Sequence, residues 1–103
     1  MAKRVYVGAR DLFFRSKLRA VVQAAGAESA GDDAACDLAV IELGTADAET
    51  RVRALVARGV PVLAFGSHVK AAELRAAREA GAEAVPNSAV EARLLARLGS
   101  GGS

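Results

Sequence analysis

Short runs of apolar residues alternate with amphipathic stretches along this chain. The apolar runs cover residues 4–8, 36–44 and 60–66, and each of them ends at a glycine. A run of this length, bounded by polar and turn-forming residues, is typical of a strand that is covered on both faces. Buried strands that alternate with amphipathic helices form a parallel sheet between two layers of helices. The pattern therefore predicts an α/β sandwich, with function at the carboxyl edge of its sheet.

The first amphipathic stretch, residues 11–26, carries clear helix signals. Phe14, Leu18 and Val22 recur at a helical spacing, which places them on one face. Asp11 stands where an N-cap belongs, and Gly26 stands where a helix commonly ends. Three further helices are expected, capped by Thr45 or Asp47, by Ser67, and by Ser88 with Glu91 as a capping box.

Three segments of the pattern are less regular. Residues 27–30 are few and lack branched side chains, so we expect only a short edge strand there. Between Gly31 and Cys36 there is room for about one helical turn, whereas a crossover connection needs about a dozen residues or more. A short fifth strand is expected at residues 82–85 and is ended by Pro86. The expected sheet therefore has five strands, of which the second is the weakest.

Composition excludes several classes of protein. The 103 residues suffice for one domain with its own core; we assign it residues 1–98 and treat the Gly/Ser-rich residues 99–103 as a flexible tail. The single cysteine, Cys36, excludes an internal disulfide, and we expect it to be an inert small residue. No apolar stretch approaches the roughly 20 residues of a membrane helix. We therefore expect a cytoplasmic protein without a membrane partner.

Three segments together carry a family resemblance. Residues 37–42 read Asp-Leu-Ala-Val-Ile-Glu, an aspartate-led apolar run that ends on an acid. They are similar to the third strand of response-regulator receiver domains, and residues 61–67 and 80–84 resemble the fourth strand and the start of the fifth. The resemblance covers about residues 3–98. It implies a flavodoxin-like fold, with a five-stranded parallel sheet of order 2-1-3-4-5 and a shortened second helix.

The departures from the receiver pattern concern its phosphorylation site. Receivers hold magnesium with an acidic pair after the first strand, where this chain has Gly8, Ala9 and Arg10. Glu42 replaces the aspartate that accepts the phosphoryl group, and Val85 stands where a lysine would precede Pro86. One acid and no lysine cannot build the usual magnesium and phosphoryl site. The sequence therefore predicts a pseudo-receiver that is not an enzyme, with no catalytic residues, no cofactor and no metal.

The expected strand ends bring a set of polar residues to the carboxyl edge. We consider them candidates for binding a ligand or an anion: Arg10, Asp11, Glu42, Ser67, His68, Asn87 and Ser88. Glu42 either forms a structural ion pair with Arg10 or imitates a charged phosphorylation site. His68 is the only histidine and either acts at a site or is a hydrogen-bonded surface group. The basic stretch around Arg15 and Arg19 is best explained as a solvated helix face, and without interleaved aromatic residues it does not indicate a nucleic-acid partner.

The last amphipathic stretch is the strongest candidate for an interface. Val90, Leu94 and Leu98 form one stripe, and Leu95 lies at its margin. Receiver-like domains commonly dimerise through the face of their fourth helix, fifth strand and fifth helix, so the resemblance implies a protein partner, which can be a second copy of this chain. The candidate interface residues are Leu95, Arg75, Arg78 and Arg93. The alternative function is a small-molecule or anion-binding module at the carboxyl edge, with Arg10, Ser67, His68 and Ser88.

Overall fold

A computed structural model describes residues 3–99 and contains the sheet that the sequence predicts. Five parallel strands lie in the order β2-β1-β3-β4-β5. Their bounds are Arg4–Gly8 for β1, Glu28–Ser29 for β2, Leu38–Glu42 for β3, Val62–Gly66 for β4 and Glu83–Pro86 for β5. The second strand is the shortest, and both of its residues are exposed. The predicted fold class and strand order are therefore confirmed.

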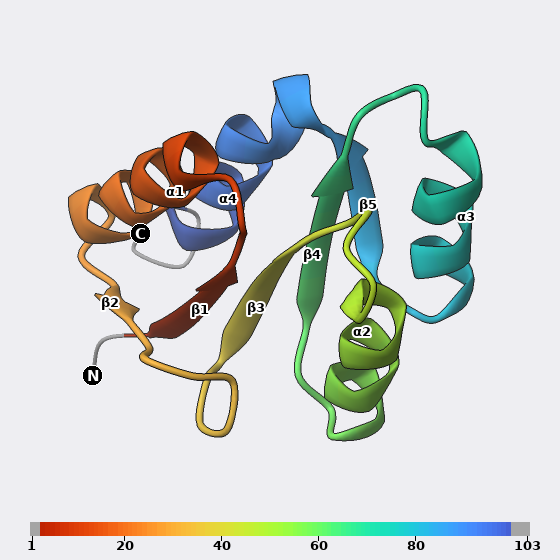
Figure 1. Cartoon of the computed structure of the whole chain (residues 1–103). Coiled ribbons are helices and arrows are strands. Elements are labelled where there is room, and N and C mark those ends of the chain that lie inside the picture. The colour runs from red at the N-terminus through yellow and green to blue at the C-terminus, as the bar shows by residue number, and fades with distance from the viewer. Residues whose placement is uncertain (1–2, 100–103) are drawn as a thin grey trace.

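Four α-helices cover the sheet, two on each face (Figure 1). They are α1 (Leu12–Ala24), α2 (Ala48–Ala57), α3 (Ala71–Glu79) and α4 (Val90–Gly99), and a short 3-10 helix, η1 (Asn87–Ala89), precedes α4. Helices α1 and α4 lie side by side on one face, and α2 and α3 lie on the other. Within residues 3–99, no helix is both long and apolar enough to cross a bilayer.

The two faces of the sheet have cores of different character. The face under α1 and α4 is packed with large side chains, which include Leu18, Phe65 and Leu94, all fully buried. The face under α2 and α3 contains fewer large side chains, such as Ile41 and Leu55, and many alanines. Alanines fill less volume between a helix and a sheet, so this second face leaves more space near the surface.

The first helix follows its sequence signals. The Asp11 carboxylate accepts hydrogen bonds from the amides of Phe13 at 2.9 Å and Phe14 at 3.3 Å, as an N-cap does. Gly26 adopts a positive φ of 80° just after the helix, in the left-handed region that only glycine enters without strain. Leu18 and Val22 are buried, while Phe14 packs against the core from a half-buried position. These predicted positions are confirmed.

The connection between β2 and β3 differs from the prediction. A shortened helix is expected between Gly31 and Cys36, but the chain bends there without forming a helix. Asp32 Oδ1 accepts a hydrogen bond from the Ala34 amide at 2.9 Å. Arg58 Nη2 donates to the carbonyl oxygens of Asp33 and Ala34 at 2.8 and 2.9 Å. Such side-chain bonds to the backbone compete with helix formation, and the segment is too short to recover that loss.

Two predicted helix caps are also wrong. Helix α3 begins at Ala71 rather than directly after Ser67, whose Oγ accepts from the Val69 amide at 3.4 Å within a turn. His68 therefore lies in this turn and not in the first turn of a helix. Ser88 lies inside η1, so its backbone is already helical and cannot adopt the extended conformation of an N-cap.

Helix α2 begins without the side-chain cap that the sequence predicts. Asp47 occupies the N-cap position of α2 but makes no side-chain cap bond; it accepts a hydrogen bond from the Thr45 hydroxyl at 3.3 Å instead. Gly99, assigned to the tail from the sequence, is the last residue of α4. The rest of the predicted tail, residues 100–103, lies outside the described residues.

Candidate functional site

The carboxyl edge of the sheet brings the end of β3 against the loop that follows β1. Glu42 is the last residue of β3, pairs in register with Phe65 of β4, and is half-buried. Its Oε1 accepts hydrogen bonds from the backbone amides of Arg10 at 2.7 Å and Asp11 at 3.1 Å. Bonds from amides to an ionised carboxylate are stronger than bonds between neutral groups. Glu42 therefore ties the β1–α1 loop to the central strand.

This contact corrects one hypothesis from the sequence. An ion pair between Glu42 and the guanidinium of Arg10 is expected, but none occurs within residues 3–99, and the bond comes from the Arg10 backbone. Backbone amides engage both Asp11 and Glu42, because Asp11 caps α1 while Glu42 holds the loop before it. Across residues 3–99, no group of three or more His, Cys, Asp or Glu could hold a metal ion.

A hollow of about 410 Å³ lies beside Glu42, and we call it the switch-point hollow. Its wall on one side is the end of β1 and the loop after it, residues 6–10, together with Arg15 and Arg19 of α1 and Gly31. The opposite wall is the end of β3 and the start of α2, with Ile41, Glu42, Thr45, Asp47 and Arg51. Chain segments from four places in the sequence therefore meet around one cavity.

Sequence reasoning identified only part of this lining. Arg10 and Glu42 are predicted candidates, whereas the sequence predicts only a solvated helix face for Arg15 and Arg19. Arg51 was missed, because the sequence places it on the outer side of a helix. In the structure its guanidinium carbon lies 5.6 Å from the centre of the Tyr6 ring. This contact depends on the open face of β1, which a helical crossover after β2 would have covered.

The remaining candidates do not lie at the hollow. Ser67, His68, Asn87 and Ser88 follow the ends of β4 and β5 and are not part of its lining. The set proposed for the anion-binding alternative is thus divided, with Arg10 separated from the two serines and the histidine. Lys70 was not considered from the sequence; its ammonium lies over Gly44, in the loop after Glu42, and 3.9 Å from Glu73.

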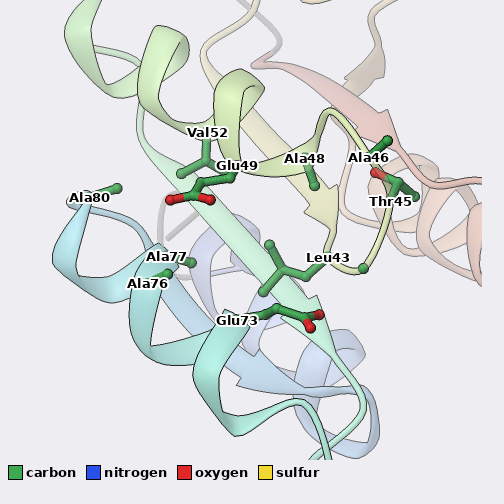
Figure 2. Close-up of a pocket in the computed structure, with 11 residues that line it drawn as sticks. Leu43, Thr45, Ala46, Ala48, Glu49, Val52, Glu73, Ala76, Ala77 and Ala80 are labelled. Atoms are coloured by element: carbon green, nitrogen blue, oxygen red, sulfur yellow. The ribbon is translucent and has the colours of Figure 1, made fainter.

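A second cavity, of about 510 Å³, lies between α2 and α3 (Figure 2). Its floor consists of small or branched apolar side chains, among them Leu43, Val52 and Ala77. Glu49 of α2 and Glu73 of α3 stand at its sides, as Figure 2 shows. The cavity follows from the alanine-rich face of α3, since alanines at 76, 77 and 80 fill little of the space between the helices.

Two of the candidate interface residues, Leu95 and Arg93, lie on opposite sides of α4. Glu83 of β5 binds both Arg93 and Arg97, with Arg97 Nη2 at 2.7 Å from Oε1. Glu91 instead forms an ion pair at 2.7 Å with Lys17 of α1, and Leu95 follows it by one helical turn. A helix advances about 100° per residue, so Leu95 lies on the α1 side and Arg93 on the β5 side. Leu95 is 52% exposed.

Two of the candidate arginines are bonded within the domain. Arg78 donates to the carbonyl oxygen of Ala84 through Nη2 at 2.9 Å, and Arg93 binds Glu83. The hydrogen bond from Arg93, supported by Arg97, holds the pKa of Glu83 below its ordinary value, although burial opposes this effect. Glu83 in turn raises the pKa of Arg93. Arg75 is exposed and lies on α3.

Cys36 is half-buried in the loop before β3. Burial is the main cause that raises the pKa of its thiol, and Arg58 partly opposes it. A raised pKa lowers the fraction of the reactive thiolate at neutral pH. This position agrees with the expected inert role.

Solved receiver domains share this fold. The BeF3-activated DrrB receiver domain matches with a TM-score of 0.79 and 19% identity over 95% of each chain. HP1043, an orphan response regulator of H. pylori, matches with a TM-score of 0.73 and 17% identity, over 93% of this chain and 96% of that one. NtrX from Brucella abortus matches 99% of this chain with a TM-score of 0.77 and 15% identity, but only 28% of NtrX is covered. No protein-family model and no curated protein matches the sequence. The chain has the receiver fold.

Proposed function

We propose that this chain is a regulatory module of receiver type that acts by binding a protein partner, which can be a second copy of itself. It does not accept a phosphoryl group at Glu42 and is not an enzyme. One observation carries the proposal: the Glu42 carboxylate is held by the amides of Arg10 and Asp11 at 2.7 and 3.1 Å. A phosphoryl acceptor must hold its carboxylate against a bound metal and in line with the donor, and in-line transfer is sensitive to shifts of about 1 Å, so a carboxylate fixed by the loop amides is poorly suited to this role.

The surroundings of Glu42 support this reading. Receivers carry an acidic pair after the first strand. Asp11 is the acid of this chain closest to that position in sequence, and its carboxylate caps α1. The nearest loop lysine, Lys70, lies over Gly44 and approaches Glu73. With the acids and the lysine arranged in this way, Glu42 serves as a fixed link between the β1–α1 loop and β3.

Incubation with acetyl phosphate and magnesium, followed by intact mass measurement, tests the first part of the proposal. The expected result is the unmodified mass for the parent protein and for Glu42→Gln. A stoichiometric phosphoryl adduct on the parent protein would contradict the proposal, and loss of the adduct in Glu42→Gln would locate it.

The binding surface that we propose lies along the seam between α1 and α4, and its occupant is a second copy of this chain. Phe13 and Leu95 are 64% and 52% exposed, and the Lys17–Glu91 ion pair joins the two helices between them. Lys17 also lies 4.7 Å from the centre of the Phe13 ring. Apolar groups around a pair of opposite charges suit a self-complementary, two-fold interface.

Light scattering after size exclusion at micromolar concentration tests self-association. We expect a dimer mass for the parent protein and a monomer mass for Leu95→Glu. Val69→Glu is the matched control, because Val69 is an exposed apolar residue before α3, away from the seam, and its variant should remain dimeric. A monomer mass for the parent protein would refute this partner.

A further inference from the structure

The switch-point hollow lies between the ends of β1 and β3, from which the chain continues to opposite faces of the sheet. After β1 the chain enters α1 on one face, and after β3 it enters α2 on the other face. In parallel α/β sheets, ligands bind at the carboxyl edge between two such strands. The missing crossover helix after β2 further opens this region, since Tyr6 and Gly8 remain only half-buried on the α2 side.

The arginines of the hollow stand out because most of them lack a carboxylate partner. Within residues 3–99, the side chains of Arg10, Arg15 and Arg19 form no ion pair or hydrogen bond. Arg51 has one distant partner, Asp47, with Nε at 3.7 Å from Oδ2. On the outer side of the same helix, Arg53 is bound to Glu49 at 2.8 Å. Like charges gathered without partners repel one another, so a bound anion would relieve this repulsion.

Two carboxylates also line the hollow, and they offset only part of its positive charge. Glu42 directs Oε1 to two backbone amides, and the Asp47 side chain is 69% exposed. Arg10, Arg15, Arg19 and Arg51 outnumber these two acids, so the hollow carries excess positive charge. The fork of a guanidinium group matches phosphate oxygens in geometry, and several forks suit a group with more than one negative charge.

We propose that the switch-point hollow binds a small organic phosphate with at least two negative charges. The hollow of about 410 Å³ lies within the range of ligand pockets, roughly 300–1,000 Å³. The Tyr6 ring and Ile41 supply an apolar wall for the organic part. The ligand binds without reacting, so this site goes beyond the protein-binding function and is independent of it.

The test is an NMR titration of the full chain with sodium pyrophosphate at constant ionic strength. We expect shifts for the amides of Gly8 and Gly31, which line the hollow, and none for Gly59 and Gly81 at the opposite edge of the sheet. Arg15→Gln with Arg19→Gln should weaken binding by about tenfold or more, since the double variant removes two charge-assisted bonds to the phosphate. Arg75→Gln, which removes an α3 arginine with no ion pair among the described residues 3–99, should bind like the parent protein. No shift at Gly8 and Gly31, or equal affinity in the double variant, would overturn the proposal.

Three further arms define the ligand and the charge. Glu42→Gln keeps an oxygen for the Arg10 and Asp11 amides but removes a negative charge, so it should tighten pyrophosphate binding several-fold. Citrate should bind more weakly than pyrophosphate, and equal affinity would refute the phosphate assignment. A nucleoside diphosphate should bind more tightly than pyrophosphate through the Tyr6 wall. If it does not, the organic part of the proposal is wrong.

Discussion

The strands β1 and β4 have the same length but different cover. All five residues of β4 are buried, because α2 and α3 pack on one face and α4 on the other. In β1, Val5 and Val7 are buried under α1, whereas Tyr6 and Gly8 on the opposite face are half-buried. The difference arises from the loop between β2 and β3, which takes the place of a crossover helix.

Two side chains compensate for the missing helix over β1. The Tyr6 ring lies along the strand, so that a Cβ at Gly8 would approach Tyr6 Cε2 at 2.8 Å. Arg51 reaches from α2 over this ring at 5.6 Å. Only glycine at position 8 allows the ring to lie flat against the strand. The comparison shows that one aromatic ring and one arginine close the face incompletely, and that the remaining space is the switch-point hollow.

The largest expected effect is on the fully covered strand. Phe65 is fully buried and its ring centre lies 5.4 Å from that of Phe14. Phe65→Ala should lower the free energy of unfolding by about 3–5 kcal/mol, since it leaves a cavity that the surrounding side chains cannot fill. Urea unfolding followed by circular dichroism measures this change, and Phe65→Leu gives a milder variant if the alanine variant does not fold.

Tyr6→Ala is the matched comparison on β1. Because the Tyr6 ring keeps part of its surface in water, we expect a smaller loss, about 1–2 kcal/mol. A loss equal to that of Phe65→Ala would mean that both strands are equally well packed, and the comparison would fail.

The next effect concerns Glu42, at the border between the two differently covered regions. Glu42→Ala removes the acceptor for the Arg10 and Asp11 amides and should cost about 1–3 kcal/mol in unfolding free energy. Glu42→Gln can still accept both bonds and should cost much less. Urea unfolding midpoints distinguish these outcomes. A glutamine variant as unstable as the alanine variant would show that the charge, and not the acceptor, stabilises the loop.

The layered fold could be predicted because it depends on local patterns. The apolar runs of β3 and β4 are themselves the signal for strands buried on both faces. The Asp11 cap likewise depends only on the residues that follow it. The caps at Ser67 and Ser88 have equally good local signals, but the turn after β4 and the 3-10 helix after β5 override them. A capping residue type can cap a helix only where its backbone adopts the conformation of an N-cap.

The site depends on contacts between distant segments and was therefore predicted only in part. Nothing near Glu42 in sequence indicates that its partners are the amides of Arg10 and Asp11. Arg51 contributes to the hollow only because the loop after β2 contains no helix. The separation of Leu95 from Arg93 on α4 can be predicted from the sequence, since residues 93 and 95 lie about 200° apart on a helix.

The smallest expected change in unfolding free energy concerns the edge strand β5. This strand differs from β2, at the other edge of the sheet, in the ion pairs that hold it. Both residues of β2 are exposed. In β5, Glu83 Oε1 accepts a hydrogen bond from Arg97 Nε at 2.9 Å and forms an ion pair with Arg97 Nη2 at 2.7 Å, and Glu83 also binds Arg93. The hydrogen bond from Arg93 is the main cause that lowers the pKa of Glu83. The ion pairs therefore stabilise the packing of β5 against α4.

The sign of the pH dependence follows from this lowered pKa. The folded state binds a proton at Glu83 more weakly than the unfolded state does, so the stabilisation is complete above the unfolded pKa of about 4.3. It is lost as the pH falls further, through the folded pKa. At pH 7, Glu83→Gln should cost about 0.5–1 kcal/mol, because these partly exposed pairs are screened by water. Urea unfolding from pH 7 down to pH 3 should show the stabilities of the parent protein and Glu83→Gln converging in acid. Glu79→Gln is the control, because it removes an exposed acid of α3 that has no ion pair within residues 3–99. Its stability should follow that of the parent protein at every pH. A difference that does not shrink at all between pH 7 and pH 3 would mean that Glu83 stabilises β5 through packing and not through its charge.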